Sequence, residues 1–483
     1  MVGDQQDDHG PSQELVNFDP ELEKWKEELV KVKENKLNDS TRMQYLSANA
    51  VFVVFLMDHY PHLILPDYLE KYKILKDQGE AKTMFMKGVK DSLEMNRVCP
   101  IDVLNLETDV FLTYLLSVKR PDGNFFSFSC YDGKRSALMH LISESGVTFD
   151  TNKKKKLSEM LVGLKKTIAK ENKEKGLRQI EGKEQMNLSV YKLTCQLLVE
   201  DGSPESIFCL CFLTLQWNLI SRSEATESIA FSQMSWEDDH LKLCFPKHKS
   251  DQVGMNKDEA RHVYSNPSMP AICPIRALSA YCLAFPQVII DGGKLFPGSE
   301  QKSRFGKCLH RIFNNNRDLY LSYHVDPQEL GTHSIRKGAA TYCCAGVHPG
   351  PPVVSVCLRA GWTIGRVKER YLKYENAGDE LVGRTLTGIP PTSCEFGVSP
   401  VYFCSSPNET DYNNLSESFL SMVFPIENTK LKCLCKQLLA CTIYHEEWIV
   451  ENSPCDSLLL NSGYFSFVAS FENRKSMVRT SLP

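Results

Sequence analysis

The sequence lacks any long uninterrupted apolar segment. Its longest apolar run extends from Ala50 to Met57, whereas a membrane-spanning helix needs roughly 20 apolar residues. The first residues, MVGDQQDDHGPSQ, are polar and acidic and contain no apolar stretch of the kind that defines a secretory signal peptide. We therefore expect a protein that is neither inserted in a membrane nor secreted.

The 18 cysteines lack the spacing of a disulfide framework or of a zinc site. Three close pairs occur without a Cys-x-x-Cys partner set or a following histidine pair: Cys209/Cys211, Cys343/Cys344 and Cys433/Cys435. Because no secretory signal is expected, reduced thiols inside a cell are the better interpretation. The sequence gives only weak support for a structural zinc, and we expect no metal and no other cofactor.

The chain also lacks an overall excess of positive charge, since 56 Lys and Arg against 60 Asp and Glu give a net charge of -4. The positive charge is local. From 151 to 185, eleven Lys and Arg against five Glu give +6, and from 217 to 376, twenty Lys and Arg against fifteen Asp and Glu give +5. The middle of the chain can therefore present a basic surface to phosphates.

At 483 residues, with 42% hydrophobic and 24% charged residues, the chain is long enough for two to four domains of about 150 residues each. Residues 1–18 are polar, and we expect them to be disordered. Apolar periodicity and capping residues predict an all-helical region over 19–175. Its expected helices are 20–34, 38–58, 69–93, 106–117, 131–145 and 157–175. The charged stretch 176–187 is the predicted linker.

Residues 188–390 mix helical patterns with a short stretch of strand chemistry. The expected helices are 188–200, 205–220, 274–283 and 303–314, and the second is apolar enough to be buried. Strands are predicted at 228–234 and 241–245, separated by a turn at 237–239. The fold class is thus mainly α with a small β-sheet. Residues 391–483, with a helix expected at 431–448, form a C-terminal extension to which the sequence assigns no chemistry.

One constellation in this region suggests a phosphate-binding site. Thr332 is a candidate N-cap of a helix that Gly346 ends, so His333 and Arg336, three residues apart, share one helical face. A second helix is expected at 352–359, ended by Ala360-Gly361, and a third at 363–375. Trp362 and Tyr371 then follow on successive elements. Taken singly, an H-x-x-R motif is common by chance, and isolated aromatic residues are more often core residues.

The whole constellation resembles the active site of the tyrosine recombinases. Members of that family carry an early arginine, a lysine on a hairpin, H-x-x-R, a histidine or tryptophan, and a tyrosine nine positions later, which is the spacing from Trp362 to Tyr371. More narrowly, GTHSIRKGAATYCCAG and LRAGWTIGRVKERYLKYENAGDELVGRTLTGIP resemble recombinases of crypton-type DNA transposons. The resemblance extends from about Trp217 to Pro390 and implies a catalytic domain preceded by a helical core-binding domain that closes around DNA.

The resemblance implies roles for six catalytic residues: Arg222, Lys249, His333, Arg336, Trp362 and Tyr371. Lys247 is the alternative to Lys249, and Tyr374 is the rival nucleophile. Glu224 is expected to orient an arginine or a histidine, although many family members have their acidic residue one position later. The spacing from Arg336 to Trp362 is also slightly long, with an insertion expected at 348–352.

These residue types suit the cleavage of a phosphodiester by a phenol. Arg222 and Arg336 would bind the two non-bridging oxygens, because a guanidinium is planar and stays charged. A free tyrosine has a pKa of about 10, and the same positive charges would favour its phenolate. Lys249 would protonate the leaving 5′ oxygen, and Tyr371 would form a 3′-phosphotyrosine that a second strand resolves.

Further basic residues are candidate contacts to the DNA backbone: Lys134, Arg135, Lys153, Lys154, Lys155, Lys156, Arg304, Lys307 and Arg311. For the last three, which lie three and four residues apart on one expected helix face, a merely solvated surface is equally compatible with the sequence. For residues 153–156, a solvated helix start and a nuclear localisation patch are also open. The expected partner is double-stranded DNA, with a homo-tetramer on DNA and a nuclear location.

Three functions compete. The first is an active site-specific recombinase that excises or integrates a crypton-like element. The second is a domesticated copy that retains the fold as a DNA-binding or chromatin-associated module without catalysis. The third is a type IB topoisomerase, but such enzymes carry lysine where this chain has His333. Because all six catalytic positions are filled, the sequence favours the first.

Overall fold

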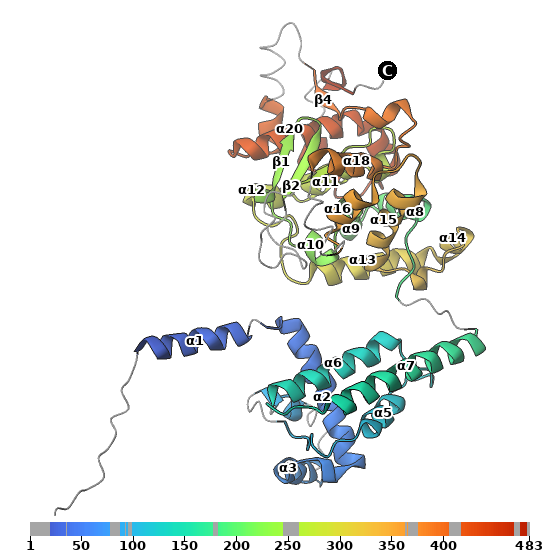
Figure 1. Ribbon diagram of the computed structural model, residues 1–483. Helices are drawn as coiled ribbons and strands as arrows, with labels where there is room; N and C mark the ends of the chain where they lie inside the picture. Colours follow the sequence, from blue (N-terminus) through green and yellow to red (C-terminus); the bar gives the residue numbers. More distant parts are fainter. Residues whose placement is uncertain are drawn as a thin grey trace, which may run out of the picture. The chain divides into compact units, whose positions relative to one another are not determined.

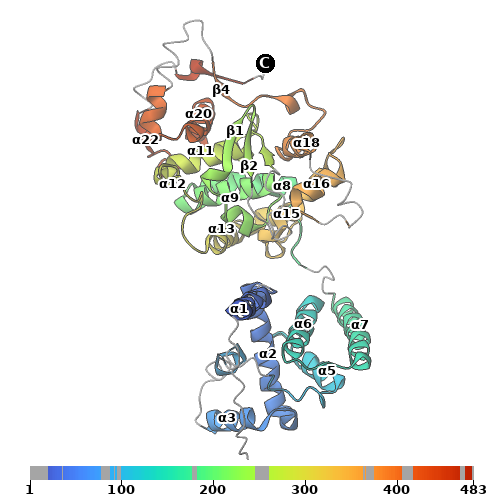
Figure 2. The same ribbon diagram turned by 60° about the vertical axis from the view of Figure 1, so that its left-hand side comes forward.

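The computed structural model describes residues 20–34, 36–77, 87–91, 93–94, 99–176, 182–244, 260–362, 365, 375–404, 417–467 and 474–480. The chain divides into two compact units, 1–181 and 182–483, which are drawn in Figures 1 and 2. The division falls inside the predicted linker 176–187. The fold is mainly helical with a small antiparallel sheet, so the predicted fold class is confirmed.

Apart from two isolated β-bridges, the described residues of unit 1 form helices, turns and loops. The helices are α1 (Pro20–Glu34), α2 (Asp39–His59), α3 (Pro66–Asp77), α5 (Thr108–Ser117), α6 (Phe128–Glu144) and α7 (Thr151–Glu174), with a 3-10 turn η1 (Pro61–Leu63). Helix α2 packs against α6, and α7 packs against α5 and α6. Their inward faces form one apolar core that includes Phe52, Phe111 and Tyr131.

Local signals placed most of these helices correctly. The Asn38 side chain caps α2 by accepting a hydrogen bond from the Thr41 N–H. The sequence predicted a helix at 131–145, with Lys134 and Arg135 near its start. Helix α6 begins earlier, at Phe128, so both residues lie in its second turn. The predicted helix 69–93 begins earlier than expected, because α3 begins at Pro66. Residues 78–86 lie outside the described residues, and 87–91 and 93–94 are helical.

Unit 2 is organised around α9 (Pro204–Leu219), in which every residue from Ser206 to Leu219 is buried. Helices α8 (Leu188–Asp201), α11 (Pro274–Ala284), α13 (Gln301–Asn315), α15 (Thr332–Thr341) and α18 (Asn376–Leu386) contact it. Shorter helices complete the unit before residue 390: α10 (Ser223–Glu227), α12 (Pro286–Asp291), α14 (Arg317–Ser322) and α16 (Val353–Ala360). The apolar run 205–220 therefore forms the buried core helix that the sequence predicts.

The sheet of unit 2 has the order β1-β2-β3, with β1 (Met234–Glu237), β2 (His240–Cys244) and β3 (Ala260–Val263) all antiparallel. The first strand was predicted at 228–234, which is wrong. Phe231–Gln233 forms the 3-10 turn η2, because the Gln233 side chain accepts a hydrogen bond from the Ala230 N–H and closes the chain on itself. The strand begins only at Met234.

Residues after 390 share the core of unit 2. Helix α20 (Thr429–Tyr444) packs on α11 and β1 (Figure 1), and the Ser279 hydroxyl donates to the Leu438 carbonyl at 2.9 Å. The predicted helix 431–448 is two helices, because the chain turns at His445 before α21 (Glu446–Asn452) begins. Helix α22 (Gly463–Phe467) and the paired strands β4 (Tyr402–Phe403) and β5 (Val478–Arg479) complete this region.

Candidate active site

Arg222 is placed by the end of the buried helix α9. Ile220, the residue after the helix, has a left-handed backbone (φ 47°) and turns the chain out of the core. Arg222 then stands at the N-cap position of the short helix α10 and is half-buried. A core helix thus presents this arginine at the edge of the unit, as the sequence suggested.

Helix α15 carries the H-x-x-R motif. Its N-cap is Gly331 and not Thr332, because the Gly331 N–H donates to the Ser334 hydroxyl and the helix begins one residue earlier than predicted. His333 is exposed, whereas Arg336 is 8% exposed. The helix continues as a π-turn, η5 (Tyr342–Gly346), which ends at the predicted glycine.

Gly338 determines how closely α15 can approach the backbone at Met186. A Cβ built on this glycine would lie 1.6 Å from the carbonyl oxygen of Met186. At the same contact, the Met186 N–H donates to the Ser334 carbonyl at 3.0 Å. The helix that carries His333 and Arg336 is therefore held against residue 186 by a backbone contact that only glycine permits.

Arg336 joins α15 to the end of α16. Its Nη2 donates to the carbonyl oxygen of Ala360 at 2.5 Å, and its guanidinium carbon lies 5.4 Å from the centre of the Trp362 ring. The left-handed Gly361 (φ 64°) turns the chain between these two contacts. Trp362 is 40% exposed. The indole therefore lies beside the guanidinium and not in the core.

Arg222 and Arg336 form a pair of like charges. Burial and the nearby charge of Arg222 lower the pKa of Arg336 to about 10. Among the described residues of unit 2, several arginines form ion pairs with carboxylates, but Arg222 and Arg336 are not among them. A buried cation without a counter-charge is unfavourable. Among the described residues, no carboxylate therefore balances the charge of these two arginines.

Two of the six predicted catalytic residues, Lys249 and Tyr371, lie outside the described residues, as do their alternatives Lys247 and Tyr374. The elements that flank them are described. Cys244 of β2 pairs with Ala260 of β3, so residues 245–259 connect the ends of this hairpin. Trp362 and α18 flank the other segment, whose predicted helix 363–375 also lies outside the described residues.

Glu224, predicted to orient an arginine or a histidine of the site, pairs with a lysine. Its carboxylate is exposed and pairs with the Lys302 ammonium of α13 at 2.6 Å. This described partner is a lysine on a neighbouring helix. The buried carboxylate of this region is instead Asp379, which is 2% exposed and binds Arg359 and His262. Arg359 and Asp379 belong to the run 358–390 quoted above and His262 does not, and nothing in their spacing signals that the three residues meet.

The predicted DNA-binding face of α13 is partly engaged within the protein. Arg304 forms two hydrogen bonds of 2.8 Å to Glu205, and Arg311 forms bonds of 2.8 and 3.0 Å to Asp201. These bidentate pairs compete with the phosphate contacts predicted for both arginines. Lys307, the third residue of the face, is exposed.

The basic residues of unit 1 also divide into paired and exposed groups. Lys153 lies 3.1 Å from Glu107, and Lys156 lies 3.3 Å from Asp109. Lys154 and Lys155, also in the first turns of α7, are exposed. On α6, Lys134 donates to the Tyr114 hydroxyl at 3.3 Å and Arg135 pairs with Asp132 at 2.9 Å. At the start of α7, the exposed lysines without a described carboxylate partner are therefore Lys154 and Lys155.

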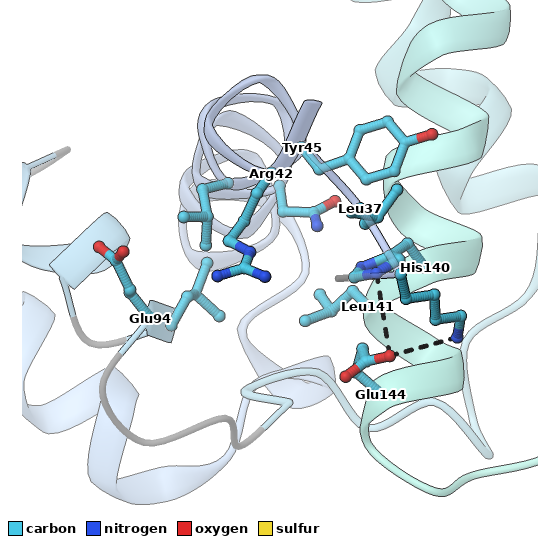
Figure 3. Close-up of a pocket in the computed structure, with 11 residues that line it drawn as sticks. Leu37, Arg42, Tyr45, Glu94, His140, Leu141 and Glu144 are labelled. Atoms are coloured by element: carbon cyan, nitrogen blue, oxygen red, sulfur yellow. Dashed lines mark hydrogen bonds and ion pairs between the residues drawn. The ribbon is translucent and has the colours of Figure 1, made fainter. Parts of the chain in front are cut away.

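Unit 1 contains a pocket of about 350 Å³ between α2 and α6 (Figure 3). Glu144 lies on its wall, 3.8 Å from the His140 Nε2 and 3.5 Å from the Lys36 ammonium. Burial lowers the pKa of His140. Positive and negative groups are thus paired with each other inside this pocket, and none of the predicted site residues lines it.

The structure also bears on the cysteines, on metals and on membranes. All 18 cysteines fall in described segments, and none of them forms a disulfide. Among the residues with described positions, no group of three or more His, Cys, Asp or Glu side chains is arranged to hold a metal ion. In the same part of the chain, the helices are too short or too polar to span a bilayer.

Comparisons with known proteins give only distant structural likenesses. No family profile matches the sequence, and no curated protein matches it either. The structure is similar to that of the XerH site-specific recombinase bound to difH substrate in a pre-cleavage complex, with 12% identity and a TM-score of 0.34, covering 69% of this chain and 93% of that one. A post-cleavage complex of XerH with palindromic difH gives 13% identity and a TM-score of 0.35, covering 71% and 96%. Likeness at this level does not establish a shared activity.

Proposed function

We propose that this protein is a tyrosine recombinase that breaks and rejoins DNA strands. The observation that carries the proposal is the Arg336 guanidinium, which lies 5.4 Å from the ring centre of Trp362 and has no carboxylate partner among the described residues. The charge of Arg222 also acts on it and lowers its pKa. As proposed, the guanidiniums of Arg222 and Arg336 would bind the two non-bridging oxygens of one phosphodiester. The exposed His333, on the same helix as Arg336, can add a hydrogen bond to that phosphate.

The proposed reaction is a transesterification. The two arginines would stabilise the charge that develops on the phosphate, which is usually the largest single contribution to such a reaction. Tyr371 would attack the phosphorus, form a 3′-phosphotyrosine and release a 5′ hydroxyl. Lys249 would give its proton to that leaving oxygen. Attack by a 5′ hydroxyl of a second strand would reverse the step, so the chemistry as proposed uses neither ATP nor a metal.

The finer assignments rest on the sequence motifs alone. The runs at 331–346 and 358–390 favour a crypton-type recombinase that excises or integrates a mobile element in the nucleus. Joining two duplexes requires four strand cleavages, so we propose a homo-tetramer assembled on double-stranded DNA. Lys154 and Lys155 are the best candidates for backbone contacts in unit 1, because both are exposed.

The proposal is tested with a nicked duplex taken from an element's end. Active protein should form a protein-DNA adduct that survives denaturant. Arg336→Ala should lower the rate of adduct formation by at least about 100-fold and should retain salt-sensitive DNA binding. Arg317→Ala, which removes an exposed arginine at the start of α14, is the matched control and should cleave normally.

The same experiment distinguishes the domesticated, non-catalytic alternative. Such a protein would bind DNA with the salt dependence of phosphate contacts but would form no adduct on any terminal sequence. Equal loss of binding and cleavage in Arg336→Ala would contradict the assignment of this arginine to the reacting phosphate.

A further inference from the structure

The buried ion pair between Arg359 and Asp379 lies where four elements meet. Arg359 is in the last turn of α16 and Asp379 is in the first turn of α18, and these helices lie side by side (Figure 1). Their side chains are 0% and 2% exposed, and the Arg359 Nη1 lies 2.5 Å from the Asp379 Oδ2. Neither residue belongs to the six predicted catalytic positions.

Arg359 uses the rest of its guanidinium to hold backbone. Its Nε and Nη2 donate to the carbonyl oxygen of Asn218 at 3.1 and 2.7 Å, and its Nη2 also donates to the carbonyl of His262 at 2.9 Å. Asn218 lies in the last turn of α9, four residues before Arg222. The planar fork therefore fixes the end of the helix that delivers the first arginine of the site.

Asp379 holds the third strand. Its Oδ2 accepts a hydrogen bond from the His262 N–H at 2.9 Å and lies 2.8 Å from the His262 Nδ1. Because an ionised carboxylate only accepts hydrogen bonds, the Nδ1 of His262 carries a proton. Strand β3 begins at Ala260, where the segment with Lys249 ends, and α18 begins just after the segment with Tyr371.

Arg261, on the same strand, binds the end of α16 through hydrogen bonds. The Arg261 Nε donates to the Arg359 carbonyl at 3.1 Å, and its Nη2 donates to the Leu358 carbonyl at 3.3 Å. The next carbonyl, that of Ala360, accepts from Arg336. The last carbonyls of α16 are thus bound by arginines from β3 and α15, immediately before Trp362.

We infer that Arg359 and Asp379 are positioning residues that assemble the proposed active site. Every one of the six predicted catalytic residues lies on α15 or in a segment directly joined to α9, β3, α16 or α18, the elements linked by these contacts. A well-packed apolar pair would fill the same space, but it would not fix directions between four backbone segments. This inference rests on the proposed function, because it assigns the network to the reaction and not only to the fold.

The test compares Asp379→Asn and Arg359→Lys with wild-type protein, using the full chain below its unfolding temperature. Arg359→Lys keeps the charge but loses the planar fork, so it separates hydrogen-bonded positioning from charge balance. We expect both variants to form the adduct at least about 10-fold more slowly, since small misplacements of catalytic groups can cost about 100-fold. The Kd for DNA should change by less than about 2-fold, because exposed cations dominate binding.

Asp201→Asn is the matched control. It breaks another bidentate arginine pair of unit 2, with Arg311, and should reduce stability without slowing cleavage. Hydrogen exchange provides a readout that does not depend on cleavage. Asp379→Asn should raise exchange in peptides covering 217–223 and 358–362, and Asp201→Asn should not.

The outcomes separate the two claims. If wild-type protein forms adduct and a folded Asp379→Asn or Arg359→Lys variant cleaves at the wild-type rate, the positioning inference is wrong and the proposed function stands. If wild-type protein forms no adduct, the proposed function fails. Unchanged exchange at 217–223 and 358–362 in Asp379→Asn would overturn the inference in either case.

Discussion

Arg336 donates a hydrogen bond to the carbonyl oxygen of Ala360, and the same guanidinium lies 5.4 Å from the ring centre of Trp362, two residues further along the chain. One side chain therefore fixes both the end of α16 and the position of the exposed indole. This relationship joins the H-x-x-R motif to the tryptophan that the sequence placed in the same site, and it makes the contribution of the ring separable by mutation.

Trp362→Ala should slow adduct formation more than Trp362→Phe. A cation-π contact at an exposed site contributes about 0.5–1 kcal/mol, which corresponds to about 2- to 5-fold in rate. Phenylalanine keeps a ring face for Arg336 but loses the indole N–H. Single-turnover rates on a nicked duplex measure the difference. Equal rates for the two variants would show that the ring face contributes nothing.

Sulfate or phosphate should stabilise wild-type protein. The pKa of Arg336 is lowered to about 10 from the usual 12.5 by burial and by Arg222. Its charged form therefore opposes folding at all pH values below about 10, and a bound anion offsets this effect. An anion at ten times its Kd adds about 1.4 kcal/mol of stability. Thermal unfolding at constant ionic strength, with chloride as the reference, measures the gain.

Two variants and one control show whether sulfate binds at the two arginines. Arg222→Ala and Arg336→Ala should lose the stabilisation by sulfate, whereas Arg317→Ala should keep it. An equal increment in all four proteins would mean that the anion acts generally on the surface and that the two arginines form no specific site.

The Asp379 carboxylate predicts a defined loss of stability in acid. Burial alone raises its pKa, but the charge of Arg359 and the hydrogen bonds from His262 outweigh burial and lower the pKa to about 2. Its contribution is therefore complete above the usual value near 4 and is lost as the pH falls from about 4 towards 2. The full contribution is on the order of 2 kcal/mol.

Comparison of wild-type protein with Asp379→Asn between pH 7 and pH 3 checks this linkage. The difference in unfolding free energy should shrink as the pH falls, because asparagine has no proton to gain. A difference that stays constant with pH would show that the carboxylate is not held ionised by Arg359 and His262.

Gly338→Ala should destabilise unit 2, although alanine normally favours a helix. The added Cβ would meet the Met186 carbonyl oxygen at 1.6 Å, so α15 must shift, at a cost of about 1–3 kcal/mol. Gly163→Ala on α7 is the matched control, because nothing lies within 4 Å of its Cβ. That variant should gain about 0.5–1 kcal/mol. Denaturant unfolding of both variants provides the test.

Sequence reasoning succeeded where a local signal determines the structure. The apolar run of α9 had to be buried, which placed Arg222 at its end, and glycines marked the ends of α15 and α16. It failed at residues 228–234, where apolar side chains pack inward from a 3-10 turn and not from a strand. Periodicity alone does not separate these cases over so few residues.

The contacts that assemble the site could not be predicted in the same way. Asp379 meets Arg359 across 20 positions and His262 across 117, and Glu224 meets Lys302 across 78. Charge patterns within one helix carry no information about such partners. The sequence therefore contains no sign that Glu224 pairs with Lys302 or that Asp379 is a buried carboxylate of the region.

Mass spectrometry of the peptide linked to DNA tests the central claim most directly. Lys373 separates Tyr371 from Tyr374, so trypsin places the two candidate nucleophiles on different peptides. After reaction with a nicked duplex and nuclease digestion, the account predicts a nucleotide attached to Tyr371 and no adduct in Tyr371→Phe. Attachment at Tyr374, or no attached nucleotide from any terminal sequence, would contradict it.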